Sequence, residues 1–232
     1  MSRLPPTSPS PSPRAPAPPR RGPVFGALLL LIALNVGVFL VELASAPFSD
    51  MMNGSLVEHG GLNGWEVDHG EWWRIVTSGF LHASGAHLFG NLVALVILGG
   101  VLSVAVGPLR MALLYAAGLL GSAVSVLAFD PNTLTVGASG AIFGLAGGAL
   151  LVGWRQRRVV LLLFAAAWIV YSLSSTLFVP GISQAGHLGG LAAGALAGTL
   201  LVGEGARLRS ERAATGIVVG LVVVLFAGAL LM

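Results

Sequence analysis

The sequence has no cysteine, no lysine and few charged residues, which make up only 9% of its 232 positions. The absence of cysteine excludes disulfide bonds and thiolate ligands to metal ions. Soluble domains carry about 25% charged residues, whereas this chain is 55% hydrophobic and has a mean hydropathy of +0.88. The composition therefore predicts an all-α protein, a polytopic bundle of membrane-spanning helices.

Residues 1–23 are rich in proline, serine and arginine. Such a segment cannot bury a hydrophobic core, so a disordered tail is predicted here. It is not interpreted as a cleaved signal peptide, because the apolar run after it is too long and no clear small-residue cleavage site ends it early.

Seven apolar segments follow, and each approaches the roughly 20 residues that span hydrocarbon, although two are shorter. They are predicted at 24–46, 86–106, 110–129, 139–154, 159–178, 187–203 and 214–232.

All twelve basic residues are arginine, and most lie at the ends of these segments. If the segments alternate in direction, every arginine except Arg74 falls on one side of the membrane. Basic residues concentrate on the cytoplasmic side of membrane proteins. We therefore predict a multi-pass protein of the cell membrane with a cytoplasmic N-terminus and an extracytoplasmic C-terminus. The pI near 10.6 is attributed to these topology signals, and no nucleic-acid partner is expected.

The first outer loop, about 47–85, is long for a connection, and such loops are usually functional or disordered. Its tryptophans suit the membrane interface and indicate that the loop is folded onto the membrane. Trp72, Trp73 and Arg74 are interpreted as interface anchors and a loop brace. His82 is interpreted as a structural link between the loop and the second segment.

Three polar residues lie at similar depth in different segments. Ser139, His187 and Asn91 are 16 or 17 residues from the predicted cytoplasmic ends of their segments, which is roughly 24–26 Å along a helix. The hydrocarbon core is about 30 Å thick. All three side chains are therefore predicted at one level, several Å below the outer surface. The fourth and sixth segments would then stop short of that surface and leave a water-filled notch.

Glycines recur every four residues on these two short segments. The two stripes are Gly140, Gly144, Gly148 and Gly186, Gly190, Gly194. Small-residue stripes allow helices to approach closely, and packing alone explains them in most apolar helices. The functional interpretation adds that this approach brings Ser139 within hydrogen-bonding reach of His187.

Ser139 and His187 each lie at the start of a predicted helix. A serine hydroxyl is a weak nucleophile unless a base accepts its proton, and a histidine does so near neutral pH. A helix N-terminus also favours the negative charge that develops near Ser139. No acid is expected at this depth, so the prediction is a Ser–His dyad. Ser122 and Ser183 have no base placed near them and are interpreted as packing or loop residues.

His87 and Asn91 are four residues apart on the second segment and therefore share one helical face. The Asn91 amide is predicted to donate a hydrogen bond to a tetrahedral oxyanion, with His87 assisting from one turn higher.

These residues resemble motifs of the rhomboid intramembrane serine proteases, in the order of that family. The matching pieces are Trp73-Arg74, His82, His87-Leu-Phe-Gly-Asn91, Gly137-Ala-Ser139-Gly140-Ala-Ile-Phe143-Gly144 and Ala185-Gly186-His187-Leu-Gly-Gly190-Leu-Ala-Ala-Gly194. The resemblance implies cleavage of transmembrane segments of membrane proteins near the extracytoplasmic face, with the lipid bilayer as surroundings and no cofactor or metal.

The same resemblance assigns Ser139 as nucleophile, His187 as general base, and Asn91 and His87 as oxyanion-hole residues. It implies a six-helix core at 24–203, preceded by the tail at 1–23 and followed by a cytoplasmic loop and a seventh helix at 204–232. Some members carry a tyrosine that stacks on the catalytic histidine where this chain has Phe143, which keeps the stacking face and lacks the hydroxyl.

Two other functions remain open. The first is a catalytically inactive relative that only binds membrane proteins, against which the presence of both Ser139 and His187 speaks. The second is a small-solute transporter or channel, which would need polar residues along a path through the membrane. The cytoplasmic halves of the second, fourth and sixth segments are nearly all apolar or glycine, and no inverted repeat of the transporter kind is evident.

Overall fold

The computed structural model describes residues 23–177, 182–201 and 209–231. In chain order the helices are α1 (Gly26–Glu42), α2 (Ser55–Gly60), α3 (Gly64–Asp68), α4 (Arg74–Thr77), the 3-10 turn η1 (Ser78–Phe80), α5 (Gly85–Val106), α6 (Pro108–Phe129), α7 (Ser139–Arg155), α8 (Val159–Thr176), α9 (Gln184–Leu201) and α10 (Glu211–Leu230). The tail predicted at 1–23 falls almost wholly outside the described residues.

The all-α prediction is confirmed. Each predicted segment coincides with one long helix, and within the described ranges the only β-type pairing is an isolated bridge between Leu62 and Thr135. Four described helices, α5, α6, α8 and most of α10, are long and apolar enough to cross a membrane. Helices α1 and α7, with 17 residues each, are shorter than that criterion requires. Helix α9 has 18 residues, as many as α8, so the expectation of a short segment fits α7 but not α9.

Several helix ends follow from local sequence. The Ser84 hydroxyl accepts a hydrogen bond from the His87 backbone N–H at 3.2 Å and so caps the start of α5. Gly107 has φ +94°, a left-handed conformation that glycine adopts without strain, and it separates α5 from α6. Pro108 then occupies the first turn of α6, where its missing N–H costs nothing.

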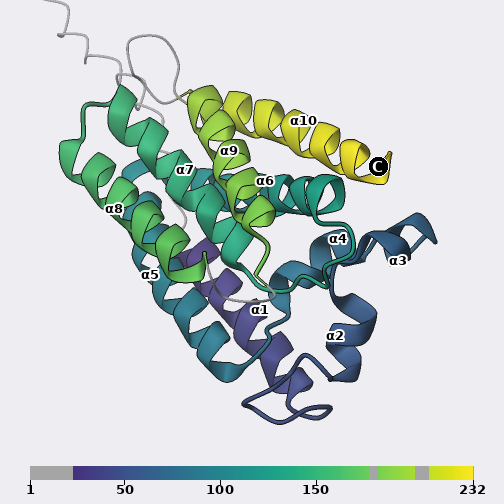
Figure 1. The fold of residues 1–232 in the computed structure, drawn as a ribbon. Coiled ribbons are helices and arrows are strands. Elements are labelled where there is room, and N and C mark those ends of the chain that lie inside the picture. Colours follow the sequence, from purple (N-terminus) through teal and green to yellow (C-terminus); the bar gives the residue numbers. More distant parts are fainter. Residues whose placement is uncertain (1–22, 178–181, 202–208, 232) are drawn as a thin grey trace, which may run out of the picture.

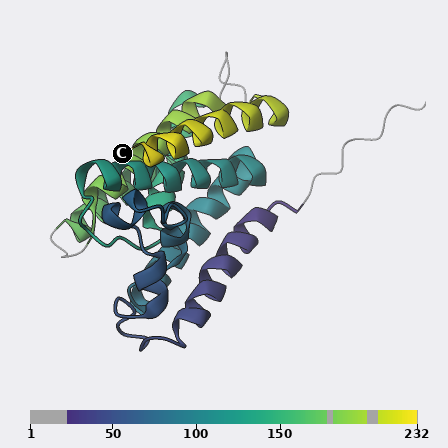
Figure 2. The ribbon, with the colours of Figure 1, turned by 90° about the vertical axis from the view of Figure 1, so that its right-hand side faces the viewer.

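Helices α6, α7 and α9 pack against one another at the centre of the bundle (Figure 1). Helix α8 lies at the edge, against α7, and α10 lies along α6 and α9. Helix α1, purple in Figure 2, stands on the far side of the bundle from α10 and contacts α5. The two helices that carry Ser139 and His187 therefore both belong to the central group.

The glycine stripes bring these central helices into backbone contact. A methyl group built on Gly194 would lie 2.0 Å from the carbonyl oxygen of Gly144, and one on Gly190 would lie 2.1 Å from that of Gly140. On the other face of α7, a methyl group on Gly144 would lie 2.4 Å from the Gly118 Cα atom of α6. No side chain fits between these backbones, so the close approach expected from the stripes is present.

The first loop is folded, as its tryptophans indicated. It contains α2, α3, α4 and η1, and Arg74 ties it together from a nearly buried position. The guanidinium donates hydrogen bonds to the carbonyl oxygens of Glu58 and Gly61 at 2.7 and 2.8 Å and forms a salt bridge with Glu71. The expectation that Arg74 braces the loop is therefore confirmed.

Candidate active site

The two polar residues expected to form a dyad are in contact. Ser139 is the first residue of α7, and its Oγ lies 3.0 Å from His187 Nε2 on α9, within hydrogen-bonding distance. Their backbones are brought together by glycine contacts that begin next to Ser139, at Gly140, and about one turn after His187, at Gly190. When the imidazole carries its proton on Nδ1, the serine hydroxyl donates to Nε2, which is the arrangement required for general-base catalysis.

The His187 ring is buried, with 5% of its surface exposed, and it stacks on Phe143 at a centroid distance of 4.4 Å and an angle of 24°. The stacking expected of Phe143 is therefore present. The Phe143 ring in turn packs on the Trp168 ring of α8, with their centroids 5.0 Å apart. Among the described residues, His187 Nδ1 has no hydrogen-bond partner, so no third member of a triad contacts this imidazole.

The loop before α7 is shaped by Gly137, which has φ +121° and donates its N–H to the Ser78 carbonyl oxygen at 2.9 Å. A methyl group on Gly137 would lie 2.6 Å from His87 Cε1 and 3.5 Å from Asn91 Nδ2. The structure therefore places both expected oxyanion residues beside the loop that leads to Ser139. Helix α7 begins two residues after Gly137, and its first backbone N–H groups have no acceptor within their own helix.

Two side-chain donors, His87 and Asn91, lie on α5, and the loop that precedes the helix orients the first of them. The Ala83 backbone N–H points at His87 Nδ1 over 3.4 Å, a long hydrogen bond that leaves the ring proton on Nε2, the nitrogen nearer Gly137. Asn91 Nδ2 is buried and has no partner among the described residues. A buried amide without a partner is costly in a folded protein, so this donor is available to a bound group.

His82 lies behind His87, at a ring-centroid distance of 5.3 Å, and is fully buried. Burial, aided by the nearby His87, lowers the pKa of His82 to about 3. Its backbone N–H donates to the Glu42 carboxyl group at the end of α1, at 3.1 Å. His82 therefore joins the loop to α1 as well as α5, in agreement with the structural role expected of it.

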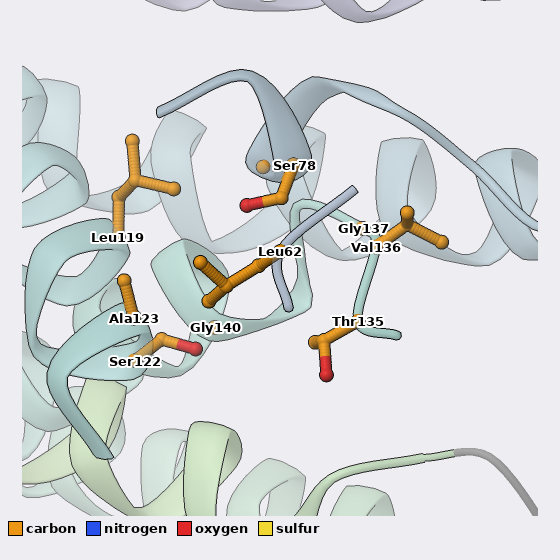
Figure 3. Close-up of a pocket in the computed structure, with 10 residues that line it drawn as sticks. Leu62, Ser78, Leu119, Ser122, Ala123, Thr135, Val136, Gly137 and Gly140 are labelled. Carbon is orange, nitrogen blue, oxygen red and sulfur yellow. The ribbon is translucent and has the colours of Figure 1, made fainter. Parts of the chain in front are cut away.

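A small cavity lies on the other side of the serine loop, between η1, α6 and Gly137 to Gly140 (Figure 3). Its volume is about 20 Å³, enough for one water molecule. Ser78, Ser122 and Thr135 line it and carry its hydroxyl groups. Ser122, interpreted from sequence as packing, is thus next to the candidate site. The described residues hold no group of three or more histidines and acids placed to bind a metal ion.

Sequence reasoning missed a contact between Asp130 and Ser183. The Ser183 hydroxyl donates to Asp130 Oδ2 at 2.5 Å and accepts from the Gly186 N–H at 3.1 Å. Helix α9 therefore begins at Gln184, three residues earlier than predicted. The available signal was a serine before an apolar helical run, a typical N-cap pattern. Its carboxylate partner could not be read from the chain.

Comparison with known proteins agrees with this geometry. A family model, the Rhomboid domain, matches residues 69–204. The chain belongs to the rhomboid family. It is 36% identical over 177 residues to "Rhomboid protease GluP" of Bacillus subtilis (strain 168). The matched region covers 74% of this chain and 34% of that protein. The chain is 33% identical over 145 residues to "Putative rhomboid protease YdcA" of the same strain, covering 59% of this chain and 70% of YdcA.

Not every rhomboid relative is described as a protease. The chain is also 33% identical over 143 residues to "Inactive RHOMBOID-like protein 8" of Arabidopsis thaliana, covering 59% of this chain and 40% of that protein. The chain spans about a third to a half of the length of the first three curated relatives. Family membership and the apolar helices identify a multi-pass membrane protein and support a function of the protease type.

Proposed function

We propose that this rhomboid is an active intramembrane serine endopeptidase, with Ser139 as nucleophile and His187 as general base. The observation that carries the proposal is the 3.0 Å contact between Ser139 Oγ and His187 Nε2. A serine beside a buried imidazole, at the start of a helix, has the parts that acyl transfer requires.

The proposed reaction has two steps. Ser139 Oγ attacks the scissile carbonyl carbon while His187 Nε2 accepts the hydroxyl proton, and the imidazole then passes this proton to the departing amine as the C–N bond breaks. Water next attacks the resulting ester and gives a proton to His187, which returns it to Ser139. The dyad works without a carboxylate on Nδ1, and the stacked Phe143 ring holds the imidazole in place.

The oxyanion of both tetrahedral intermediates is proposed to lie between the start of α7 and the face of α5. The Asn91 amide and His87 Nε2 lie beside Gly137. The first N–H groups of α7, which have no acceptor within their own helix, are proposed to complete the oxyanion hole. Donors that are already in place stabilise charge as it forms, because they need no rearrangement in the transition state.

The proposed substrates are transmembrane segments that unwind near the extracytoplasmic face. An intact helix hides its carbonyl groups in i to i−4 hydrogen bonds, so the scissile segment must be extended to reach Ser139. Helix-breaking residues such as glycine or proline near the outer boundary favour this state. The arginine distribution supports a cytoplasmic N-terminus in the cell membrane.

The test is a cleavage assay in liposomes with a single-span substrate, comparing the unaltered chain with Ser139→Ala. We expect the alanine variant to lose cleavage and labelling by a fluorophosphonate, while its thermal unfolding is unchanged. The mapped cut should fall in the outer third of the substrate span. Cleavage by the alanine variant at a near-native rate would refute the serine assignment, and a cut in the cytoplasmic half would refute the orientation.

The alternative is a catalytically inactive member that binds membrane proteins, a possibility supported by the inactive relative in Arabidopsis. In that case the unaltered chain would retain the substrate without cleaving it, and the fluorophosphonate would label neither the unaltered chain nor Ser139→Ala. Labelling that also depends on His187 would exclude this alternative.

A further inference from the structure

The start of α9 is tied to the end of α6 by a hydrogen-bonded chain. Asp130, which follows the last residue of α6, accepts a hydrogen bond from the Ser183 hydroxyl at 2.5 Å. Ser183 is buried, with 7% of its surface exposed, and its oxygen accepts from the Gly186 N–H at 3.1 Å. Its carbonyl oxygen accepts from the His187 N–H at 3.3 Å. One serine therefore connects a carboxyl group on α6 to the turn that carries the imidazole.

Asp130 fixes the orientation of the Ser183 hydroxyl group that caps α9. A serine hydroxyl has one proton, and here that proton is held by the carboxyl group in a short hydrogen bond of the charge-assisted kind. The lone pairs of the oxygen are then left to accept from the α9 backbone. Without Asp130 the hydroxyl can rotate and donate elsewhere, which weakens its hold on the Gly186 N–H.

The cap acts at the first turn of α9. Gly190 and Gly194 fix the next turns against the α7 backbone. The first turn, where helices fray most readily, packs at Gly186 and Gly189 against α6, and it contacts α7 through His187, which lies at hydrogen-bonding distance from Ser139. Asp130 itself does not contact the imidazole, since His187 Nδ1 has no partner within the described part of the chain. The hydrogen bonds that lead from the Asp130 carboxyl group to the His187 backbone pass through Ser183.

We propose that Asp130 is a positioning residue for His187, acting through the Ser183 cap to hold the imidazole at hydrogen-bonding distance from Ser139. This inference rests on the proposed protease function. A displacement of about 1 Å in a catalytic group reduces rates by about 100-fold, so a loosened first turn is enough to impair the reaction while the rest of α9 stays in place.

The experiment uses an exchange of capping groups. Asp130→Ala should lower kcat by about 10- to 100-fold with little change in KM, and Asp130→Asn, which keeps an acceptor, should lose less. Ser183→Asp supplies a carboxylate that caps the Gly186 N–H directly. We expect Ser183→Asp to restore kcat to within a few-fold in the Asp130→Ala chain. In a chain that keeps Asp130, Ser183→Asp should lower kcat, because two carboxylates then face each other.

A matched control is Asp50→Ala. Asp50 also accepts local hydrogen bonds, from Met52 N and Asn53 Nδ2, but these lie in the first loop. This variant should leave kcat unchanged. Thermal unfolding of each variant shows whether it folds, and Asp130→Asn replaces Asp130→Ala if the latter does not.

The ¹⁵N chemical shifts of the His187 imidazole give a readout that does not need catalysis. They should change in Asp130→Ala and return in the double variant, whether or not the chain cleaves a substrate. If the unaltered chain neither cleaves nor reacts with fluorophosphonate, the proposed function fails and these shifts still test the positioning role. Unchanged shifts and kcat in Asp130→Ala, or a double variant as impaired as the single one, would overturn the inference.

Discussion

Helices α9 and α8 both pack against α7, yet they do so in different ways. The α9 backbone lies directly on the α7 backbone at Gly190 and Gly194. Helix α8 contacts α7 mainly through side chains. Only 11% of its residues are buried, whereas 50% are buried in α6, the other central neighbour of α7. Side chains of α8 such as Val160 are mostly exposed. The proposed nucleophile and base lie on the tightly packed pair. Helix α8 contacts this region through Trp168, which packs on Phe143, and through Thr176, which accepts hydrogen bonds from Gln184 at the start of α9.

The two contacts differ in how much movement they allow. Backbone contact leaves no room for adjustment, because protein interiors are close-packed and respond to even small changes in volume. Such contact suits two residues that must remain 3.0 Å apart. A helix with few buried side chains can move at lower cost.

The largest effect is expected from Gly194→Val in the tightly packed pair. The added atoms would overlap the Gly144 backbone, and overpacking of this kind should cost about 3 kcal/mol of unfolding free energy, the upper end of the usual range. The control is Gly220→Val on α10, where a methyl group meets nothing within 4 Å. Thermal unfolding in detergent should show a large loss for Gly194→Val and almost none for Gly220→Val. Equal melting of the two variants would mean that α7 and α9 do not depend on backbone contact.

A smaller effect, confined to the rate, is expected from Asn91→Ala on α5. This residue belongs to the site but not to the glycine contacts, so the fold should remain intact. Loss of one oxyanion donor should reduce kcat by roughly 10- to 1000-fold, with KM changed less because the bond strengthens only in the transition state. His87→Ala should be milder, since the α7 N–H groups remain. A loss of thermal stability that parallels the loss of kcat would instead assign Asn91 to packing.

The smallest effect is expected from Trp168→Ala on α8. Removing this ring leaves Phe143 without one of its two aromatic neighbours and should lower kcat by about 2- to 10-fold, the equivalent of the 0.5–1.5 kcal/mol of an aromatic pair. Tyr171→Ala, on an exposed position of the same helix, is the control and should have no effect. If both variants behave like the unaltered chain in the cleavage assay, the contact between Trp168 and Phe143 does not influence the imidazole.

The sequence predicted the long helices well where local signals mark their ends. The segment expected at 139–154 is α7 at Ser139–Arg155, because an apolar, glycine-rich run is bounded by a glycine turn and three arginines. The first segment was predicted to continue to residue 46, whereas α1 ends at Glu42. The Glu42 carboxyl group accepts a hydrogen bond from the His82 backbone N–H, 40 positions away, and no local sequence pattern predicts such a partner.

The short helices of the first loop were beyond prediction for a different reason. Helices of four to six residues, such as α2, α3 and α4, are too short to show a hydrophobic period. They are held by distant groups, above all by Arg74 on the carbonyl oxygens of Glu58 and Gly61.

The sequence by itself determined which residues are candidates for the site. A serine and a histidine in apolar surroundings, each at the start of a helix with a glycine stripe, stand out because polar groups are costly there. Tertiary structure alone decided that Ser139 Oγ and His187 Nε2 lie 3.0 Å apart and that Asp130 binds a serine 53 positions away. Such distances depend on the separation and angle at which whole helices pack, and that geometry is set by the sum of many contacts and not by any short stretch of the chain.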